Sequence, residues 1–196
     1  MKKQVLLVSM LIISALLWSS DLWSSDLQFF REDLSFTLTD SSLSVDGDYY
    51  FRNNSEKDIE RLLFYPFPQD SLYGEVTDSF AITQDSINVL GKITTEGSFF
   101  KVIIPAGKER FVRVGYTHQL LANQAEYILL TTRNWGLPFE VVNYSLEFSK
   151  ELKVYDFSLL PDDLTEDENK YYLSWHKEDF MPKTNFIVKF NKPVAE

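Results

Sequence analysis

The chain has 196 residues and a formal net charge of −10, with 29 acidic and 19 basic side chains, two histidines and no cysteine. This acidic balance argues against binding to nucleic acid or to anionic lipid surfaces, because both require basic patches. The missing cysteines exclude disulfides, zinc–thiolate sites, cysteine nucleophiles and iron–sulfur ligation, and two histidines cannot supply a three-histidine metal site.

Residues 1–25 are predicted to be a signal peptide and a short spacer. Lys2 and Lys3 precede an apolar run at residues 5–18, which has the length of a secretory leader and is shorter than the roughly 20 residues of a membrane-spanning helix. The pentapeptide Leu-Trp-Ser-Ser-Asp then occurs twice, at residues 17–26, and is interpreted as a polar spacer. Large residues stand where signal peptidase wants small ones, which leaves an uncleaved anchor open.

This leader predicts where the protein works. We expect an exported protein that is periplasmic, at the cell surface or secreted. Contact with a membrane is expected only if the leader is retained. No cysteine follows the apolar run, so a lipoprotein anchor is excluded.

Residues 26–196 are predicted to form an all-β domain. Apolar and polar side chains alternate in several segments, as in strands that bury one face. These segments are residues 34–39, 43–51, 112–117, 142–149, 171–176 and 186–191. Two further runs, Leu62 to Tyr65 and Tyr127 to Leu130, are apolar on both faces and are predicted to be central strands.

The spacing of turns and strands predicts the architecture. No window has a convincing helical period, and about eleven strands at spacings near ten residues indicate an antiparallel β-sandwich with little or no helix outside the leader. One large sandwich and two small stacked ones are both compatible with the pattern. If the domain is divided, the boundary is expected near Gln119 to Glu126.

Two runs carry a resemblance to a known group of proteins. VDGDYYFRNNSEKDIERLLFYPFPQD (Val45 to Asp70) and YILLTTRNWGLPFEVVNYSLEF (Tyr127 to Phe148) resemble exported all-β domains of bacteria that have no assigned function. In these domains a Gly-x-Tyr-x-Phe-x-Asn strand precedes a Tyr-Pro-Phe-Pro turn, and a Tyr-Ile-Leu strand precedes a Trp-Gly-x-Pro turn. Because these motifs are turn and core residues, the resemblance implies a fold and export, and it implies no active site.

Four aromatic residues are the candidates for binding. Trp135 precedes Gly136 in a turn, where its ring either stacks on a sugar or a partner, or folds back as a plug on the sandwich; the pattern favours the plug. Phe67 lies between two prolines and is expected to be tucked in rather than presented. Tyr172 and Trp175, on opposite faces of the 171–176 segment, complete the set.

The acidic segment at residues 161–169 is the candidate for a metal. Its carboxylates suit calcium, which takes several oxygen ligands, but the spacing lacks the pattern of an EF-hand, so a solvated loop is favoured and no cofactor is expected. The candidate ligands are Asp162, Asp163, Glu166, Asp167 and Glu168.

No catalytic constellation can be named from the sequence. His118 continues an inward-facing strand pattern and is expected to be a core or rim histidine, and His176 lies on a polar face and is expected to be exposed. No Gly-x-Ser-x-Gly elbow presents a nucleophile, and nothing nominates a pair of carboxylates for glycoside cleavage. We therefore expect a protein that is not an enzyme.

The functional expectation is an exported, non-catalytic binding or structural module of the cell envelope. Its expected partner is an envelope protein or a surface glycan. The alternative is a carbohydrate-binding module that uses loop aromatics, with or without calcium. A glycan binder should expose a row of aromatic rings, whereas a protein-interaction module should expose a compact apolar patch or an unpaired strand edge.

Overall fold

The computed structural model describes residues 26–192, so the predictions for residues 1–25 lie outside it. The described residues form thirteen strands and one short 3-10 helix, which confirms the predicted all-β class. The elements are β1 (Leu27–Leu38), β2 (Ser42–Asn53), β3 (Ile59–Pro66), β4 (Tyr73–Thr83), β5 (Leu90–Ile93), β6 (Gly97–Ile104), β7 (Glu109–Leu120), β8 (Gln124–Tyr127), η1 (Leu130–Trp135), β9 (Phe139–Ser149), β10 (Lys153–Phe157), β11 (Asp163–Glu166), β12 (Lys170–Phe180) and β13 (Phe186–Asn191). No helix in this part of the chain is long and apolar enough to span a bilayer.

The strands form three sheets. The large sheet has seven strands in the order β11-β12-β9-β1-β2-β7-β4, and two small sheets have the orders β10-β13-β8 and β3-β6-β5. The predicted antiparallel sandwich is confirmed with one exception, because β1 and β9 pair in parallel. These two strands are about a hundred residues apart in the chain, so no tight hairpin forces them to run in opposite directions.

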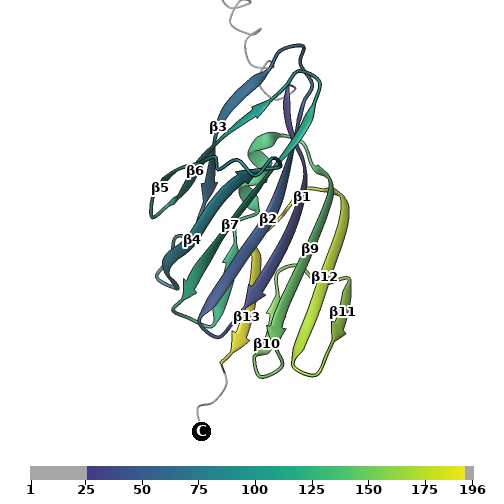
Figure 1. The fold of residues 1–196 in the computed structure, drawn as a ribbon. Coiled ribbons are helices and arrows are strands. Elements are labelled where there is room, and N and C mark those ends of the chain that lie inside the picture. Colours follow the sequence, from purple (N-terminus) through teal and green to yellow (C-terminus); the bar gives the residue numbers. More distant parts are fainter. Residues whose placement is uncertain (1–25, 193–196) are drawn as a thin grey trace, which may run out of the picture.

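Both small sheets cover the same face of the large sheet. The β3–β6–β5 sheet lies at the upper left of Figure 1, while β10 and β13 lie toward the bottom. Phe36 of the large sheet stacks on Phe186 of β13 at 4.7 Å between ring centroids, and Tyr116 packs on Tyr65 of β3 at 5.7 Å. One hydrophobic core joins the three sheets.

Period-2 alternation builds the large sheet as the sequence predicts. In β2, Leu43, Val45 and Tyr49 are buried, while the residues between them are partly exposed. Each inward side chain loses water contact and each outward one keeps it, so the pattern fixes which face meets the core.

Both predicted central strands are corrected by the structure. Strand β3 is an edge strand of a small sheet, and Leu62 and Phe64 on its outer face are 65% and 46% exposed. Strand β8 ends at Tyr127 rather than at Leu130. There the amide oxygen of Asn185 accepts hydrogen bonds from the backbone N–H groups of residues 129 and 130, at 3.1 and 3.0 Å, in place of a neighbouring strand.

The acidic segment is also more ordered than a loop. Residues Asp163–Glu166 form β11, an edge strand that pairs with β12. All four of its side chains are exposed, so the strand is short and charged, as sheet edges commonly are.

Candidate functional site

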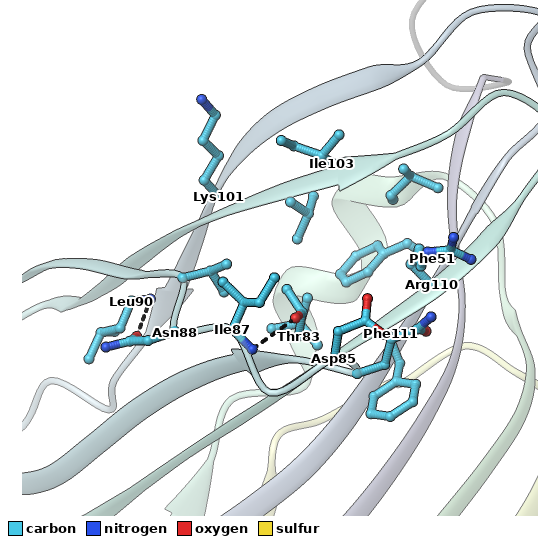
Figure 2. Close-up of a pocket in the computed structure, with 15 residues that line it drawn as sticks. Phe51, Thr83, Asp85, Ile87, Asn88, Leu90, Lys101, Ile103, Arg110 and Phe111 are labelled. Carbon is cyan, nitrogen blue, oxygen red and sulfur yellow. Dashed lines mark hydrogen bonds between the residues drawn. The ribbon is translucent and has the colours of Figure 1, made fainter.

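A pocket of about 480 Å³ opens between the large sheet and the β3–β6–β5 sheet. We call it the intersheet pocket. Its floor consists of buried apolar side chains from β2, β6 and β7, and its rim carries polar side chains together with the exposed Ile87 and Ile103 (Figure 2). The floor residues are Phe51, Val102, Ile104 and Val112.

Strand alternation decides which β6 side chains enter this pocket. Val102 and Ile104 face the core and are 2% and 0% exposed. Figure 2 shows Lys101 and Ile103 on the opposite side of β6 from the Phe51 ring. Lys101 forms an ion pair there with Glu60 at 2.5 Å. The pocket itself is therefore lined by the apolar half of β6.

The connection between β4 and β5 forms the outer wall of the pocket. Its turn is held by the Thr83 hydroxyl, which accepts a hydrogen bond from the Ile87 N–H at 3.2 Å. Val89 then donates to the Ala81 carbonyl at 2.8 Å, in the large sheet, and accepts from the Lys101 N–H at 3.4 Å, in the small sheet. Residue 89 thus bridges the two sheets and anchors the wall to both.

Charge is confined to the rim of the intersheet pocket. The titratable side chains at its mouth are Asp85 and Arg110. Asn88 also lies on the rim, and its side-chain oxygen is held by the Leu90 N–H at 2.9 Å. An apolar floor below a polar rim can enclose a hydrocarbon group and orient the polar end of the same molecule.

A second pocket, of about 180 Å³, lies beside the first, between β3 and η1. We call it the tyrosine pocket because three tyrosines from three strands line it together with one carboxyl group: Tyr49, Tyr65, Tyr127 and Glu32. Phe51 lines both pockets and separates them. Thr131 and Trp135 of η1 form its other side.

Glu32 is the most unusual side chain of this region. It lies on β1 with 2% exposure, and Tyr144 and Tyr127 donate hydrogen bonds to its two carboxylate oxygens at 2.8 and 3.2 Å. Burial away from water penalises the charged form and raises the pKa of Glu32 to about 7, although the two hydroxyl donors oppose this shift. The carboxyl group is therefore divided between its charged and neutral forms near neutral pH.

The tyrosine hydroxyls continue from Glu32 as a chain. Tyr127 lies 3.0 Å from the Tyr49 hydroxyl, which lies 2.7 Å from the Tyr65 hydroxyl. Burial raises the pKa of all three tyrosines well above its usual value, so they stay neutral. Because Tyr49, Tyr65 and Tyr127 come from three different sheets, this network holds the sheets together at one point.

Of the four predicted binding residues, two lie in the core. Phe67 and Trp175 are each 1% exposed, and the Trp175 indole donates to the Leu159 carbonyl at 3.0 Å. This placement corrects the prediction for these two residues, because a side chain enclosed by the core presents no face to a ligand. Phe67 is tucked in, as expected.

The other two predicted residues remain partly accessible. Trp135 is half-buried at the end of η1, and its ring packs on Phe29 at 5.6 Å and on Phe51 at 5.7 Å, as the plug interpretation expects. Gly136 follows in the left-handed region at φ 77°, which closes η1. Tyr172 lies on the outer face of β12, and its hydroxyl donates to Asp167 at 2.7 Å.

Two carboxylates of the acidic segment form ion pairs or hydrogen bonds with other residues of the chain. Asp162 pairs with Lys177 and accepts the His176 N–H, and Asp167 accepts two backbone N–H groups. Within residues 26–192 no three His, Cys, Asp or Glu side chains gather as a metal site, so the geometry adds no support for calcium. The predicted ligands in this segment were Asp162, Asp163, Glu166, Asp167 and Glu168.

The two histidines occupy the environments that the strand patterns predict. His118 is 2% exposed on β7, and burial lowers its pKa. The His176 side chain is 60% exposed, and its Nδ1 lies 2.7 Å from the Asn143 amide oxygen. Neither residue lines the intersheet pocket or the tyrosine pocket.

Sequence reasoning missed Glu32 and the whole intersheet pocket. The signal for Glu32 was present, because the inward series Leu38, Phe36 and Leu34 extends back to position 32 at a spacing of two. A charged residue in register with buried ones marks a buried polar site. The intersheet pocket has no comparable signal, because its lining comes from strands far apart in the chain.

Exposed aromatic residues do not form the row that sugar binding would require. Among the described residues the well-exposed aromatic side chains are Phe64 of β3 and Tyr155 of β10, which belong to different sheets. Apolar side chains do gather on the outer face of the β3–β6–β5 sheet. This outer patch consists of Leu62, Phe64, Phe99 and Ile103, with the rings of residues 64 and 99 separated by 4.9 Å.

No family model and no curated protein matches the chain, whereas solved structures share its fold. A Legionella pneumophila protein provisionally described as nutrient-binding matches 85% of this chain and 67% of its own, with 13% identity and a TM-score of 0.65. An M1 zinc metallopeptidase from Deinococcus radiodurans matches 84% of this chain and 42% of its own, with 14% identity and a TM-score of 0.52. At this identity the likeness shows the fold alone. The resemblance to exported domains of unknown function therefore holds for the all-β fold.

Proposed function

We propose that the protein is an exported, non-catalytic binding module of the cell envelope whose intersheet pocket holds the apolar part of a small ligand. The observation that carries this proposal is the pocket itself. Its volume of about 480 Å³ falls within the range of roughly 300–1,000 Å³ that is usual for small-molecule sites, and its floor is apolar.

The chemistry of the lining sets the kind of ligand. A hydrocarbon group placed against Val102, Ile104 and Val112 is removed from water, at about 25 cal/mol per Å² of apolar surface. Asp85 and Arg110 on the rim bring opposite charges to the mouth, where the polar end of the ligand meets solvent. The description of one structural relative as nutrient-binding is compatible with such a role.

Two features support the envelope and the absence of catalysis. The leader pattern at residues 1–25 supports export. The intersheet pocket is lined by neither histidine nor cysteine, and its charged groups lie at the mouth rather than against the floor. A ligand bound on the floor would touch hydrocarbon, which supplies no acid, base or nucleophile.

The test uses a fluorescent apolar probe. Titration of the protein with 1-anilinonaphthalene-8-sulfonate is expected to give saturable fluorescence that n-octanol displaces. The variant Val89→Trp, which fills the pocket from its wall, should lose this binding. The matched control Leu160→Trp adds the same ring at a position that is 76% exposed and outside the pocket, and it should bind as the wild type does.

Equal probe binding by the Val89→Trp variant and the wild type would contradict the proposal. Fractionation of the native cells gives the compartment independently. Recovery of the protein in the envelope or the medium supports export, and recovery only with the cytoplasmic fraction rejects it.

The outer patch favours a second candidate function, which is docking to an envelope protein. Leu62 and Ile103 are 65% and 59% exposed on adjacent strands, and among the described strands β3 pairs with β6 alone. Exposed apolar patches and unpaired edges are common sites of protein contact. Mild cross-linking in the native envelope should capture one stoichiometric partner that the double variant Leu62→Lys, Phe64→Lys fails to capture.

A further inference from the structure

The tyrosine pocket carries an inference that is independent of the intersheet pocket. We propose that the tyrosine pocket binds a small primary ammonium ion, with the nitrogen at the Glu32 carboxylate and the carbon chain along the aromatic walls.

Glu32 is a buried carboxyl group whose hydrogen-bond partners are neutral. Its two donors are the hydroxyls of Tyr144 and Tyr127, and within residues 26–192 no positive side chain contributes to its electrostatics. A buried carboxylate without a positive partner is costly, and each of its oxygens can accept more than one hydrogen bond. A cation that enters the pocket would supply both the missing charge and the further donors.

The hydrogen bonds along the tyrosine hydroxyls can run in either of two donor-to-acceptor orders, and one of these orders favours a bound cation. When Glu32 is charged, Tyr65 donates to Tyr49, Tyr49 to Tyr127, and Tyr127 to the carboxylate. This order points every proton toward Glu32 and leaves the oxygen lone pairs of Tyr65, at the end of the chain, available to a donor. An ammonium group has three N–H donors and no acceptor, so it matches a carboxylate and hydroxyl oxygens together.

The walls of the pocket suit the carbon chain and the charge. Aromatic rings from the large sheet, the small sheet and η1 line the cavity, and ring faces attract cations. A volume of about 180 Å³ admits roughly six water-sized groups at about 30 Å³ each, which fits an ammonium ion with three to five carbons. The rings that line it include Phe29, Tyr49, Tyr65, Tyr127 and Trp135.

The groups around Glu32 also set the pH range of binding. The titratable side chains that face it are Tyr144 on β9, Tyr127 on β8, Tyr49 on β2 and Tyr65 on β3, and Asp33 is its neighbour on β1. The tyrosines stay neutral below pH 10, so Glu32 alone changes charge near neutrality. Affinity for an ammonium ion should therefore rise between pH 6 and pH 8.

The experiment is calorimetric titration of the full protein with n-butylammonium at pH 8, compared with n-butanol and butyrate. Saturable binding of the ammonium ion, at least tenfold tighter than that of n-butanol, is expected. The variant Glu32→Gln should weaken this binding at least tenfold. The matched control Glu168→Gln changes an exposed carboxylate outside both pockets and should leave it unchanged.

Two further measurements keep the proposal testable if Glu32→Gln does not fold. The affinity of the wild type should rise at least fivefold from pH 6 to pH 8, and Trp135→Leu, which keeps the carboxylate, should weaken binding several-fold. Equal affinity for n-butanol and n-butylammonium, unchanged binding by Glu32→Gln, or binding of neutral sugars in place of the ammonium ion would each overturn the proposal. Val89→Trp should keep ammonium binding, which separates this site from the intersheet pocket.

Discussion

The two small sheets cover the same face of the large sheet, but they pack against it with different tightness. Under the β10–β13–β8 sheet, Phe186 lies 4.7 Å from the Phe36 ring and 5.1 Å from the Trp175 ring, and all three side chains are about 1% exposed. Under the β3–β6–β5 sheet, a pocket of about 480 Å³ remains. We call the first region the sealed end and the second the hollow end, after the packing of these side chains between the sheets.

The size of the inward side chains explains this difference. Aromatic rings at the sealed end reach across the gap of about 10 Å between packed sheets. At the hollow end the floor has one ring, that of Phe51, among the shorter side chains of Val102, Ile104 and Val112. Protein interiors are close-packed, and an unfilled cavity lowers the stability of the fold. A cavity that is kept despite this cost offers a place for a ligand.

The largest effect is expected from emptying the sealed end. Trp175→Ala removes a side chain that is 1% exposed, and it should lower the free energy of unfolding by about 3–5 kcal/mol. Urea denaturation followed by circular dichroism measures this loss. Leu164→Ala, at an exposed position on β11, should change stability by less than about 0.5 kcal/mol. Similar losses for the two variants would show that the end is not sealed.

The next largest effect is the dependence of the unfolding free energy on pH, which Glu32 causes at the junction of the three sheets. Its pKa is raised from 4.5 to about 7 in the folded protein, so the folded state keeps a proton that the unfolded chain has released. Stability should fall as pH rises from about 4.5 to about 7, by roughly 3 kcal/mol at about 1.4 kcal/mol for each pKa unit.

The variant Glu32→Gln isolates this dependence from that of other groups. His118 has a lowered pKa and acts with the opposite sign, because it costs stability as pH falls below 6.5. The difference in unfolding free energy between the wild type and Glu32→Gln removes the His118 contribution. This difference should change by about 2.5 kcal/mol between pH 5 and pH 8, and a constant difference would contradict the raised pKa.

A matched pair of leucines compares the two ends more finely. Leu173 is 2% exposed in the core, whereas Leu90 is half-buried and lines the intersheet pocket. Leu173→Ala should cost about 2–5 kcal/mol and Leu90→Ala about 1 kcal/mol, because removal of a side chain that already faces a cavity loses fewer contacts. Thermal denaturation of both variants measures the gap. Equal losses would mean that the hollow end is packed as tightly as the core.

The smallest effect is expected on the outer face of the large sheet. Arg113 forms two hydrogen bonds with the Asp46 carboxylate, at 2.7 and 2.5 Å, and the arginine side chain is 52% exposed. Solvent screens such a pair, so Arg113→Gln should cost about 0.5 kcal/mol in low salt and nothing measurable in 1 M sodium chloride. A larger loss that persists in high salt would indicate coupling to the core.

The large sheet is the part of the fold that the sequence predicts. Period-2 alternation identifies the inward residues of β2, β9 and β12 and hence the sandwich, because burial of one face is a property of each strand alone. Pairing is a property of two strands, so the parallel contact of β1 with β9 left no local trace. The prediction of β3 as a central strand was wrong for the same reason. Its outer face is apolar although it is exposed, and the sequence alone does not distinguish such a face from a buried one.

Prediction of the candidate sites depends still more strongly on knowing which strands and sheets pack together. Phe67 and Trp175 were reasonable binding candidates as loop and strand aromatics, yet cross-sheet packing buries both. Trp135 does line a pocket, but the carboxyl group at the base of that pocket comes from a strand about a hundred residues earlier in the chain. Only Glu32 itself carried a local signal, as a charged residue in an inward register.

The most direct test of the hollow and sealed ends is a methyl-resolved NMR titration with n-octanol. Methyl signals of Val89, Val102 and Val112, around the intersheet pocket, are expected to shift together and saturate. Those of Val142 and Val188, in the core of the sealed end, should not move. Shifts spread evenly over both ends, or none at all, would contradict the view that one end of this sandwich is built to hold a ligand.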